Sequence, residues 1–275
     1  AVFFSGCSLG CVFCQNRAIS RGQSGKMITV ERLAEIFLDL QRQKANNINL
    51  VTAGHFLVQV REALILAKKQ GLTIPVVYNS SGYEKAEMLQ LLDGLVDIYL
   101  PDFKYMESDL AGKYSHAKDY PEIAREALAE MVRQAGTPEF DDRGMMKKGV
   151  IVRHLLLPGH VRNSRKVLEY LYETYKDQIY ISLMNQYTPI PSVLEKTLPK
   201  LTQKKLAAPE PLREKSAAQP ESAQACLTGL QRRLTEDEYE ALIDFAIENG
   251  IENGFIQDQE TAQESFIPAF DGEGI

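Results

Sequence analysis

Three cysteines stand close together near the amino end of the chain, at Cys7, Cys11 and Cys14. Thiolates bind zinc and iron–sulfur clusters, and cysteines so tightly spaced in a reducing compartment indicate a metal site rather than disulfide bonds. Because Gly6 and Gly10 let the backbone curl, the three thiolates can reach three corners of one iron–sulfur cube. The segment offers no fourth ligand, so the spacing predicts a cluster with one open corner.

Zinc and unliganded thiols are the alternatives to this open cluster. A structural zinc ion is closed by four ligands, usually from two short motifs, and the second motif is missing here. The remaining cysteine, Cys226, lies far along the chain in a segment of irregular composition, and the nearest histidine is His55. A carrier of the ferredoxin type would also need a fourth cysteine. The spacing therefore favours the open cluster over both alternatives.

The cysteines directly follow the first of several apolar, β-branched runs that alternate with segments of helical period. These runs are nearly continuously apolar, as buried parallel strands are. The predicted strands are 1–5, 47–52, 74–79, 96–100, 150–156 and 179–184, with a shorter seventh candidate at 254–257. Strands separated by helices predict a parallel sheet with right-handed crossovers, either open and doubly wound or forming an incomplete barrel.

Helices are predicted where apolar residues recur at the spacing of one helix face. The predicted helices include 30–40, 60–67, 121–134, 164–175 and 235–249. Two residue pairs fit the capping box that opens a helix, Ser81 with Glu84 and Thr235 with Glu238.

The interval 191–233 differs from the rest of the chain. It is rich in Ala, Pro, Gln and Lys and has no regular apolar period, which predicts a flexible surface insertion. Its basic residues could alternatively mark a docking arm. Residues 1–190 and 234–275 would then form a single domain.

The composition is that of a folded protein. The chain has 275 residues, of which 44% are hydrophobic and 25% charged, and its 31 Lys and Arg against 37 Asp and Glu give a net charge of −6. That sign disfavours nucleic acid as a partner. Because no apolar run approaches the ~18 residues of a membrane span and no secretion signal opens the chain, we expect a cytoplasmic protein without membrane contact. The chain begins at Ala1 inside an apolar run, so we also expect that upstream residues are missing.

The cysteine segment resembles a known family. The pattern Cys7-x-x-x-Cys11-x-x-Cys14, with Phe13 before the third cysteine, resembles the radical S-adenosylmethionine (SAM) enzymes. Residues 2–20 look more narrowly like the subgroup related to the pyruvate formate-lyase activating enzyme. That likeness continues through 49–52, 77–79, 100–104, 184–189 and 254–257. The resemblance implies an α/β fold, a six-stranded partial (β/α) barrel of the TIM type.

The resemblance also implies the cofactors and the chemistry. In that family three cysteines hold a [4Fe-4S] cluster, and SAM chelates the open iron. An electron from the cluster splits SAM reductively into a 5′-deoxyadenosyl radical that abstracts a substrate hydrogen. The implied metal ligands are Cys7, Cys11 and Cys14, and the implied electron donor is an external protein of the flavodoxin or ferredoxin type.

Several polar residues at the carboxyl ends of the predicted strands are candidates for cofactor binding, since that edge of a barrel hosts the chemistry. Asp102 and Lys104 share one face if the strand geometry continues, and the resemblance implies that Lys104 pairs with the methionine carboxylate of SAM. An ion pair at the barrel rim is the structural alternative. Arg153 and His154 point to opposite faces, and we expect Arg153 inside, opposite an acid or a ligand carboxylate.

Three further residues are cofactor-binding candidates. Thr52 ends the second predicted strand, where relatives receive the methionine amino group with backbone atoms, although the usual glycine-rich segment is lacking. Asn79 ends the third strand, and Phe13 could stack on adenine or lie in the core. Tyr187 stands where some activating enzymes have a histidine that contacts the cofactor.

Three functions remain open at this stage. The first is a radical SAM oxidoreductase that activates a glycyl radical enzyme, which would be its protein partner. The second applies the same radical chemistry to a small molecule or a peptide. The third is a binding protein without catalytic activity that a metal stabilises.

Overall fold

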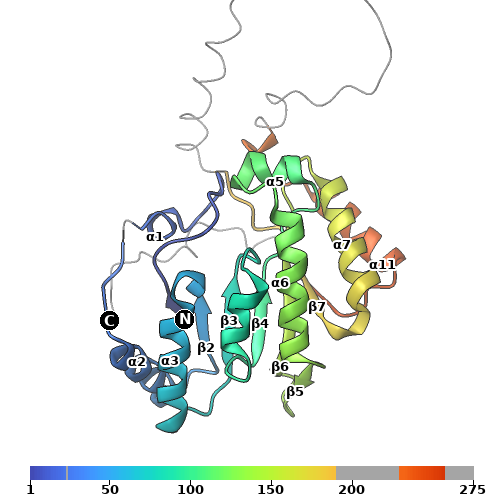
Figure 1. Ribbon diagram of the computed structural model, residues 1–275. Helices are drawn as coiled ribbons and strands as arrows, with labels where there is room; N and C mark the ends of the chain where they lie inside the picture. Colours follow the sequence, from blue (N-terminus) through green and yellow to red (C-terminus); the bar gives the residue numbers. More distant parts are fainter. Residues whose placement is uncertain (23, 190–228, 258–275) are drawn as a thin grey trace, which may run out of the picture.

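The computed structural model describes residues 1–22, 24–189 and 229–257, in which strands and helices alternate along the chain (Figure 1). The strands are β1 (Val2–Phe3), β2 (Ile48–Val51), β3 (Val76–Ser80), β4 (Ile98–Pro101), β5 (Glu139–Phe140), β6 (Met146–Leu155), β7 (Tyr180–Met184) and β8 (Gly254–Ile256). The α-helices are α1 (Arg17–Ser20), α2 (Val30–Arg42), α3 (Leu57–Lys69), α4 (Ala86–Leu89), α5 (Ser108–Ser115), α6 (Tyr120–Ala135), α7 (Val161–Tyr175) and α11 (Glu236–Glu248).

The strands form one sheet in the order β1-β2-β3-β4-β6-β7-β8, and each neighbouring pair in that order is parallel. The short β5 pairs antiparallel with β6 beside this series. Within the part of the chain that the structure describes, no pairing joins β1 to β8, so the sheet does not close. The predicted partial barrel is confirmed, and the candidate strand at 254–257 is β8, which makes the parallel series longer than the six strands expected.

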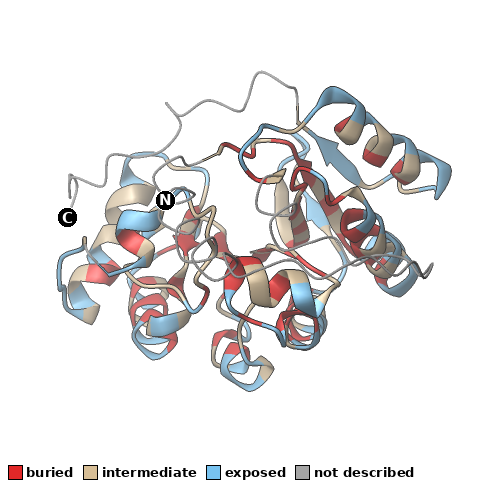
Figure 2. Ribbon diagram, turned by 90° about the horizontal axis from the view of Figure 1, so that it is seen from above, coloured by how far each residue is buried: buried red, intermediate tan, exposed pale blue. Residues whose placement is uncertain are grey.

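The two faces of the sheet differ in burial because alternate side chains point in opposite directions. Leu50, Tyr78, Tyr99 and Val152 share the outer face and are fully buried. Helices form an outer row around the strands and cover this face (Figure 2). The inner face keeps partial solvent access at polar positions, so it is the face available to a ligand.

One of the two predicted capping boxes is confirmed and the other is wrong. Thr235 and Glu238 each bond the backbone of the other and open α11. Glu84 does not cap a helix, because α4 begins two residues later at Ala86, and its carboxylate instead accepts a hydrogen bond from Ser80 Oγ. The short segment between β3 and α4 therefore folds back onto the strand instead of starting a helix at once.

Two elements had no clear sequence signal. Helix α5 spans eight residues with Gly112 inside it, so its apolar period is too short to stand out. Strand β5 has two exposed residues. Strand β6 also begins at Met146, four residues before the predicted start, in a stretch that contains two lysines.

Most of the interval expected to be an insertion, together with Cys226, lies outside the described residues. Its last residues are described, and there Leu230 is fully buried while its carbonyl accepts a 2.6 Å hydrogen bond from Tyr187 Oη. The end of this interval thus packs on the barrel near β7. None of the described helices has the length and apolar character to cross a lipid bilayer.

Candidate cofactor site at the carboxyl ends of the strands

The cysteine loop begins where β1 ends and is fastened to neighbouring segments by its backbone. Phe4 N donates to Val51 O at 3.0 Å, and Gly6 N donates to Ile19 O at 2.8 Å. Gly6 has φ +98°, a conformation that glycine adopts without strain. A turn of this kind directs the chain away from β1 and across the top of the sheet.

The far side of the loop docks on the carboxyl end of α5. Gly10 N donates to Ser115 O at 3.1 Å, and Val12 N donates to Tyr114 O at 2.8 Å. A side chain at Gly10 would place its Cβ 2.9 Å from His116 Cδ2, so the ring of His116 would have to move to make room for it. The helix carbonyls that lack partners within α5 are satisfied by the loop, which positions the cysteines.

The three cysteines are free thiols and are partly buried. Burial raises the pKa of Cys7. Burial also raises the pKa of Cys11, although the positive charge of Lys104 acts to lower it. Thiolates in such surroundings need a cationic partner, and a metal is one. Among the described residues, no three Cys, His, Asp or Glu side chains are arranged to hold a single ion. A cluster binds each thiolate at a different iron, and the three cysteine thiols of this loop are donors of the kind that iron–sulfur clusters take.

Asp102, at the end of β4, is held between two cations. Its carboxylate lies 2.5 Å from Lys104 Nζ and 2.7 Å from Arg153 Nη2. Although burial alone would raise the pKa of Asp102, Arg153 and Lys104 outweigh burial and hold the pKa below its ordinary value. One carboxylate and two cationic side chains give the trio of Asp102, Lys104 and Arg153 one net positive charge. The trio can therefore accept one further carboxylate, and the side chains of Asp102 and Lys104 are each 15% exposed.

Asn79 and Arg153 are neighbours on the inner face of the sheet. They share this face because alternate residues of each strand point to opposite faces and the strands pair in register. Arg153 Nη2 donates to Asn79 Oδ1 at 2.8 Å, and β4 meets β6 at a bridge between Asp102 and Arg153. Arg153 Nε and Asn49 Oδ1 are buried and have no hydrogen-bond partner among the described residues. Because a buried polar atom without a partner is costly, these two atoms indicate a place where a polar ligand binds.

Thr52 adopts a left-handed conformation, with φ +60°. This conformation is strained for a β-branched residue, by about 1–3 kcal/mol, and such strain often marks a ligand site. Its amide donates to Asn79 O at 2.9 Å, which places Thr52 beside the third strand end. His55 is exposed in the following turn and lies against Gly6 of the cysteine loop.

Phe13 lies against the segment that follows β7. Its ring meets Tyr187 edge to face, with centroids 6.2 Å apart, and Gln15 Nε2 donates to Gln186 O at 3.3 Å. The structure thus brings Asn79, Asp102 and Arg153 together with Lys104 in one group that is joined by hydrogen bonds and ion pairs. It places Phe13 against Tyr187, just after β7, and so engages its ring with another aromatic.

Glu84 was missed as a site residue because it matched a helix-capping pattern. Burial raises its pKa to about 7; Asp102 also raises the pKa, whereas the Ser80 hydrogen bond and Lys104 lower it. A Cβ on Gly54 would lie 3.6 Å from Glu84 Oε1, so Glu84 reaches from the end of β3 to the turn after β2. Its position just after a strand's carboxyl end was the available signal.

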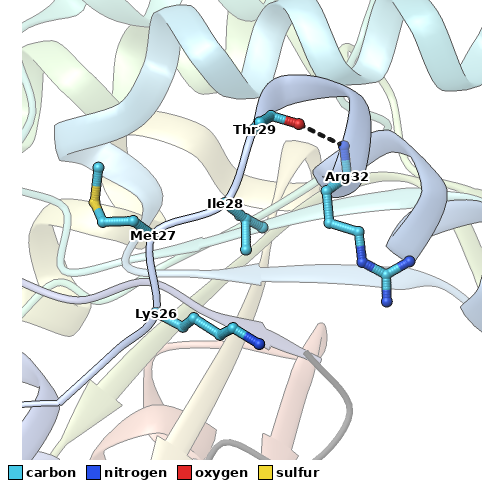
Figure 3. A pocket seen from close by; sticks show the side chains of 5 residues that line it. All are labelled: Lys26, Met27, Ile28, Thr29 and Arg32. Carbon is cyan, nitrogen blue, oxygen red and sulfur yellow. Dashed lines mark hydrogen bonds between the residues drawn. The ribbon is translucent and has the colours of Figure 1, made fainter.

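A shallow hollow lies before α2 and is lined by Lys26, Met27, Ile28, Thr29 and Arg32 (Figure 3). The hydrogen bond drawn there joins Arg32 N to Thr29 Oγ1 at 3.1 Å, which is a helix N-cap. Met27 is 93% exposed. The helix start explains this hollow, and its walls contain none of the residues of the cofactor site.

Comparison with known proteins decides the family. A family model described as the Radical SAM superfamily matches residues 1–182. The chain belongs to this superfamily. Members of the radical SAM superfamily use a [4Fe-4S] cluster and SAM, which agrees with the predicted cofactors. The narrower likeness to the pyruvate formate-lyase activating enzyme stays a prediction.

Individual proteins are similar to this chain in sequence or in fold. The chain is 30% identical over 199 residues to "Uncharacterized protein MJ0674" of Methanocaldococcus jannaschii, covering 68% of this chain and 53% of that protein. SuiB of Streptococcus suis has a similar fold, with a TM-score of 0.53 at 10% identity over 93% of this chain and 48% of SuiB. A structure of SuiB bound to the precursor peptide SuiA gives 0.52 at 8% identity and the same coverage. This radical SAM chain thus spans about half the length of these proteins.

Proposed function

We propose that the chain is a radical SAM enzyme in which Cys7, Cys11 and Cys14 hold a [4Fe-4S] cluster and leave one iron open for SAM. The observation that carries this proposal is the cysteine loop docked beside the positively charged trio of Asp102, Lys104 and Arg153. When bound, the cluster and SAM supply the 5′-deoxyadenosyl radical. The protein's own residues bind and orient these groups.

Lys104 and Arg153 would bind the methionine carboxylate, and Asp102 fixes the position of both cations. This role accounts for the surplus positive charge at a site that is largely removed from water. Asn79 holds Arg153 in place through its amide oxygen. Thr52, at the neighbouring strand end, would offer backbone atoms to the methionine amino group, and Phe13 would offer a ring face to adenine.

For the substrate, we propose a glycyl radical enzyme, so that the chain acts as its activase. The sequence likeness of residues 2–20 to the activating-enzyme subgroup supports this role. Reduction would come from an external carrier of the flavodoxin or ferredoxin type.

Radical modification of a peptide is the second candidate function. SuiB, which shares the fold, has been crystallised with the precursor peptide SuiA.

The experiment is anaerobic reconstitution with iron and sulfide, followed by dithionite and SAM. We expect about four irons per chain and the formation of 5′-deoxyadenosine. Cys7→Ala, Cys11→Ala and Cys14→Ala should each abolish cleavage, whereas Cys226→Ala should leave it intact. Zinc binding without cleavage, or an equal loss from Cys226→Ala, would overturn the proposal. An EPR doublet on a captured protein partner supports the activase role, and a modified free peptide without such a doublet supports the second candidate.

A further inference from the structure

The sulfur of Cys11 is reached by two buried hydroxyl groups in series. Cys11 Sγ lies 3.0 Å from Ser115 Oγ, and Ser115 Oγ lies 2.9 Å from Tyr105 Oη. Ser115 is 1% exposed and Tyr105 is fully buried. Ser115 is the last residue of α5, and Tyr105 follows Lys104 in the loop after β4, so the series links the ion-paired loop to the cysteine loop.

The direction of the hydrogen bonds follows from the chemistry of the sulfur. A thiolate that binds a metal has no proton, so Ser115 must be the donor to Cys11. Because serine has a single hydroxyl proton, Ser115 Oγ then acts as acceptor toward Tyr105, whose phenol donates. Burial, and next the charge of Cys11, raises the pKa of Tyr105 well above its usual value, which keeps that proton in place. Each bond in such a series strengthens the next.

The hydroxyl of Ser115 is not needed to place the loop. The backbone of α5 already fastens the loop through the hydrogen bonds that Gly10 and Val12 donate. What the side chain adds is a donor at the sulfur. The other two cysteines have different surroundings, since the backbone of Leu9 acts to lower the pKa of Cys7 and Cys14 lies 3.5 Å from Ser20 Oγ in a partly exposed setting.

We propose that Ser115 and Tyr105 are positioning residues that raise the reduction potential of the cluster by donating a hydrogen bond to Cys11. The inference rests on the proposed function, because it takes Cys11 as a cluster ligand. One-electron reduction adds negative charge to the cluster and its sulfurs, and a donor at a sulfur stabilises the reduced state more than the oxidised state. The pair would thereby ease the reduction of the cluster by its external electron donor, which precedes SAM cleavage.

The experiment is a redox titration of the reconstituted protein, followed by EPR of the reduced cluster. At a fixed applied potential near the midpoint, we expect Ser115→Ala to lower the ratio of reduced to oxidised cluster by roughly threefold or more. Tyr105→Phe should lower the ratio less, because Ser115 still donates. Ser115→Thr keeps the hydroxyl and should restore the wild-type value.

The matched control is Ser164→Ala. Ser164 is as buried as Ser115, but its Oγ bonds His154 Nε2 at 2.8 Å instead of a cysteine. This variant should leave the reduction potential unchanged. A cluster that assembles normally in Ser115→Ala with an unshifted potential would overturn the inference, as would an equal shift in the control.

Two outcomes separate this inference from the proposed function. If Ser115→Ala does not assemble a cluster, Tyr105→Phe decides alone, and an unshifted potential there overturns the inference. If the wild-type chain assembles no cluster at all, the proposed function fails and the inference fails with it.

Discussion

Replacing Lys104 with methionine tests the carboxylate site in the sharpest way. Methionine keeps most of the length of the side chain but removes the charge, so the trio with Asp102 and Arg153 falls from one net positive charge to zero. Asp102 keeps its 2.7 Å ion pair with Arg153, so no buried charge is left alone. For that reason the cost in folding stability should be about 1 kcal/mol, rather than the ~3–5 kcal/mol of a fully broken buried pair.

The cost in SAM affinity should be larger. A charge-assisted hydrogen bond contributes about 1.5–3 kcal/mol, which corresponds to roughly 10- to 150-fold in affinity. Coulomb attraction at about 4 Å and an effective dielectric constant of about 20 sets an upper bound of about 4 kcal/mol. The Lys104 side chain is only 15% exposed, so solvent screens this attraction weakly.

The assay is anaerobic calorimetry of SAM binding to the reconstituted protein, with Lys166→Met as control. Lys166 also forms a short ion pair, 2.6 Å from Glu107, but its side chain is 40% exposed. We expect the control to change SAM affinity less than twofold. An affinity loss of less than threefold in Lys104→Met, or equal losses in both variants, would refute the carboxylate site and make Lys104 a structural partner of Asp102.

Three further predictions concern stability. The raised pKa of Glu84, about 7, means that the folded protein holds a proton which the unfolded chain releases near pH 4.5, so stability should fall as pH rises between these values. In denaturant titrations of the apoprotein, Glu84→Gln should remove up to about 3 kcal/mol of the pH dependence of the unfolding free energy. An unchanged pH dependence would count against the raised pKa of Glu84. Gly10→Ala should cost about 1–3 kcal/mol and reduce iron incorporation, because its Cβ would meet the ring of His116; normal iron content would contradict this. Tyr187→Phe should lower the unfolding free energy by about 1–2 kcal/mol through loss of its bond to Leu230, and an unchanged melting temperature would argue that this contact is weak.

The fold was predictable because parallel strands buried on both faces have a strong sequence signal. Continuous apolar runs marked β2, β3, β4 and β7 to within a few residues. Strand β5 and helix α5 escaped because they are short and have no clear apolar period. Their existence depends on tertiary contacts, and α5 ends where its carbonyls bind the cysteine loop.

The candidate site was predictable where the alternation of side chains along a strand decides which face of the sheet a residue occupies. Asp102 and Arg153 share a face of neighbouring strands, and the acid expected opposite Arg153 is Asp102 itself. Glu84 and Ser115 could not be placed in the same way, because each acts through a contact with a residue that sequence spacing does not reveal. Glu84 also matched a helix cap, and a local pattern cannot show that the chain folds back to Ser80.

The most direct test of the central claim is electron–nuclear double resonance of the reduced, reconstituted protein with SAM labelled at the methionine amino nitrogen and carboxylate. If Cys7, Cys11 and Cys14 leave one iron open, both labels should couple to the cluster spin, as expected for chelation of that iron. Absence of coupling at saturating SAM, together with a fourth cysteine or histidine ligand in the same spectra, would contradict the account.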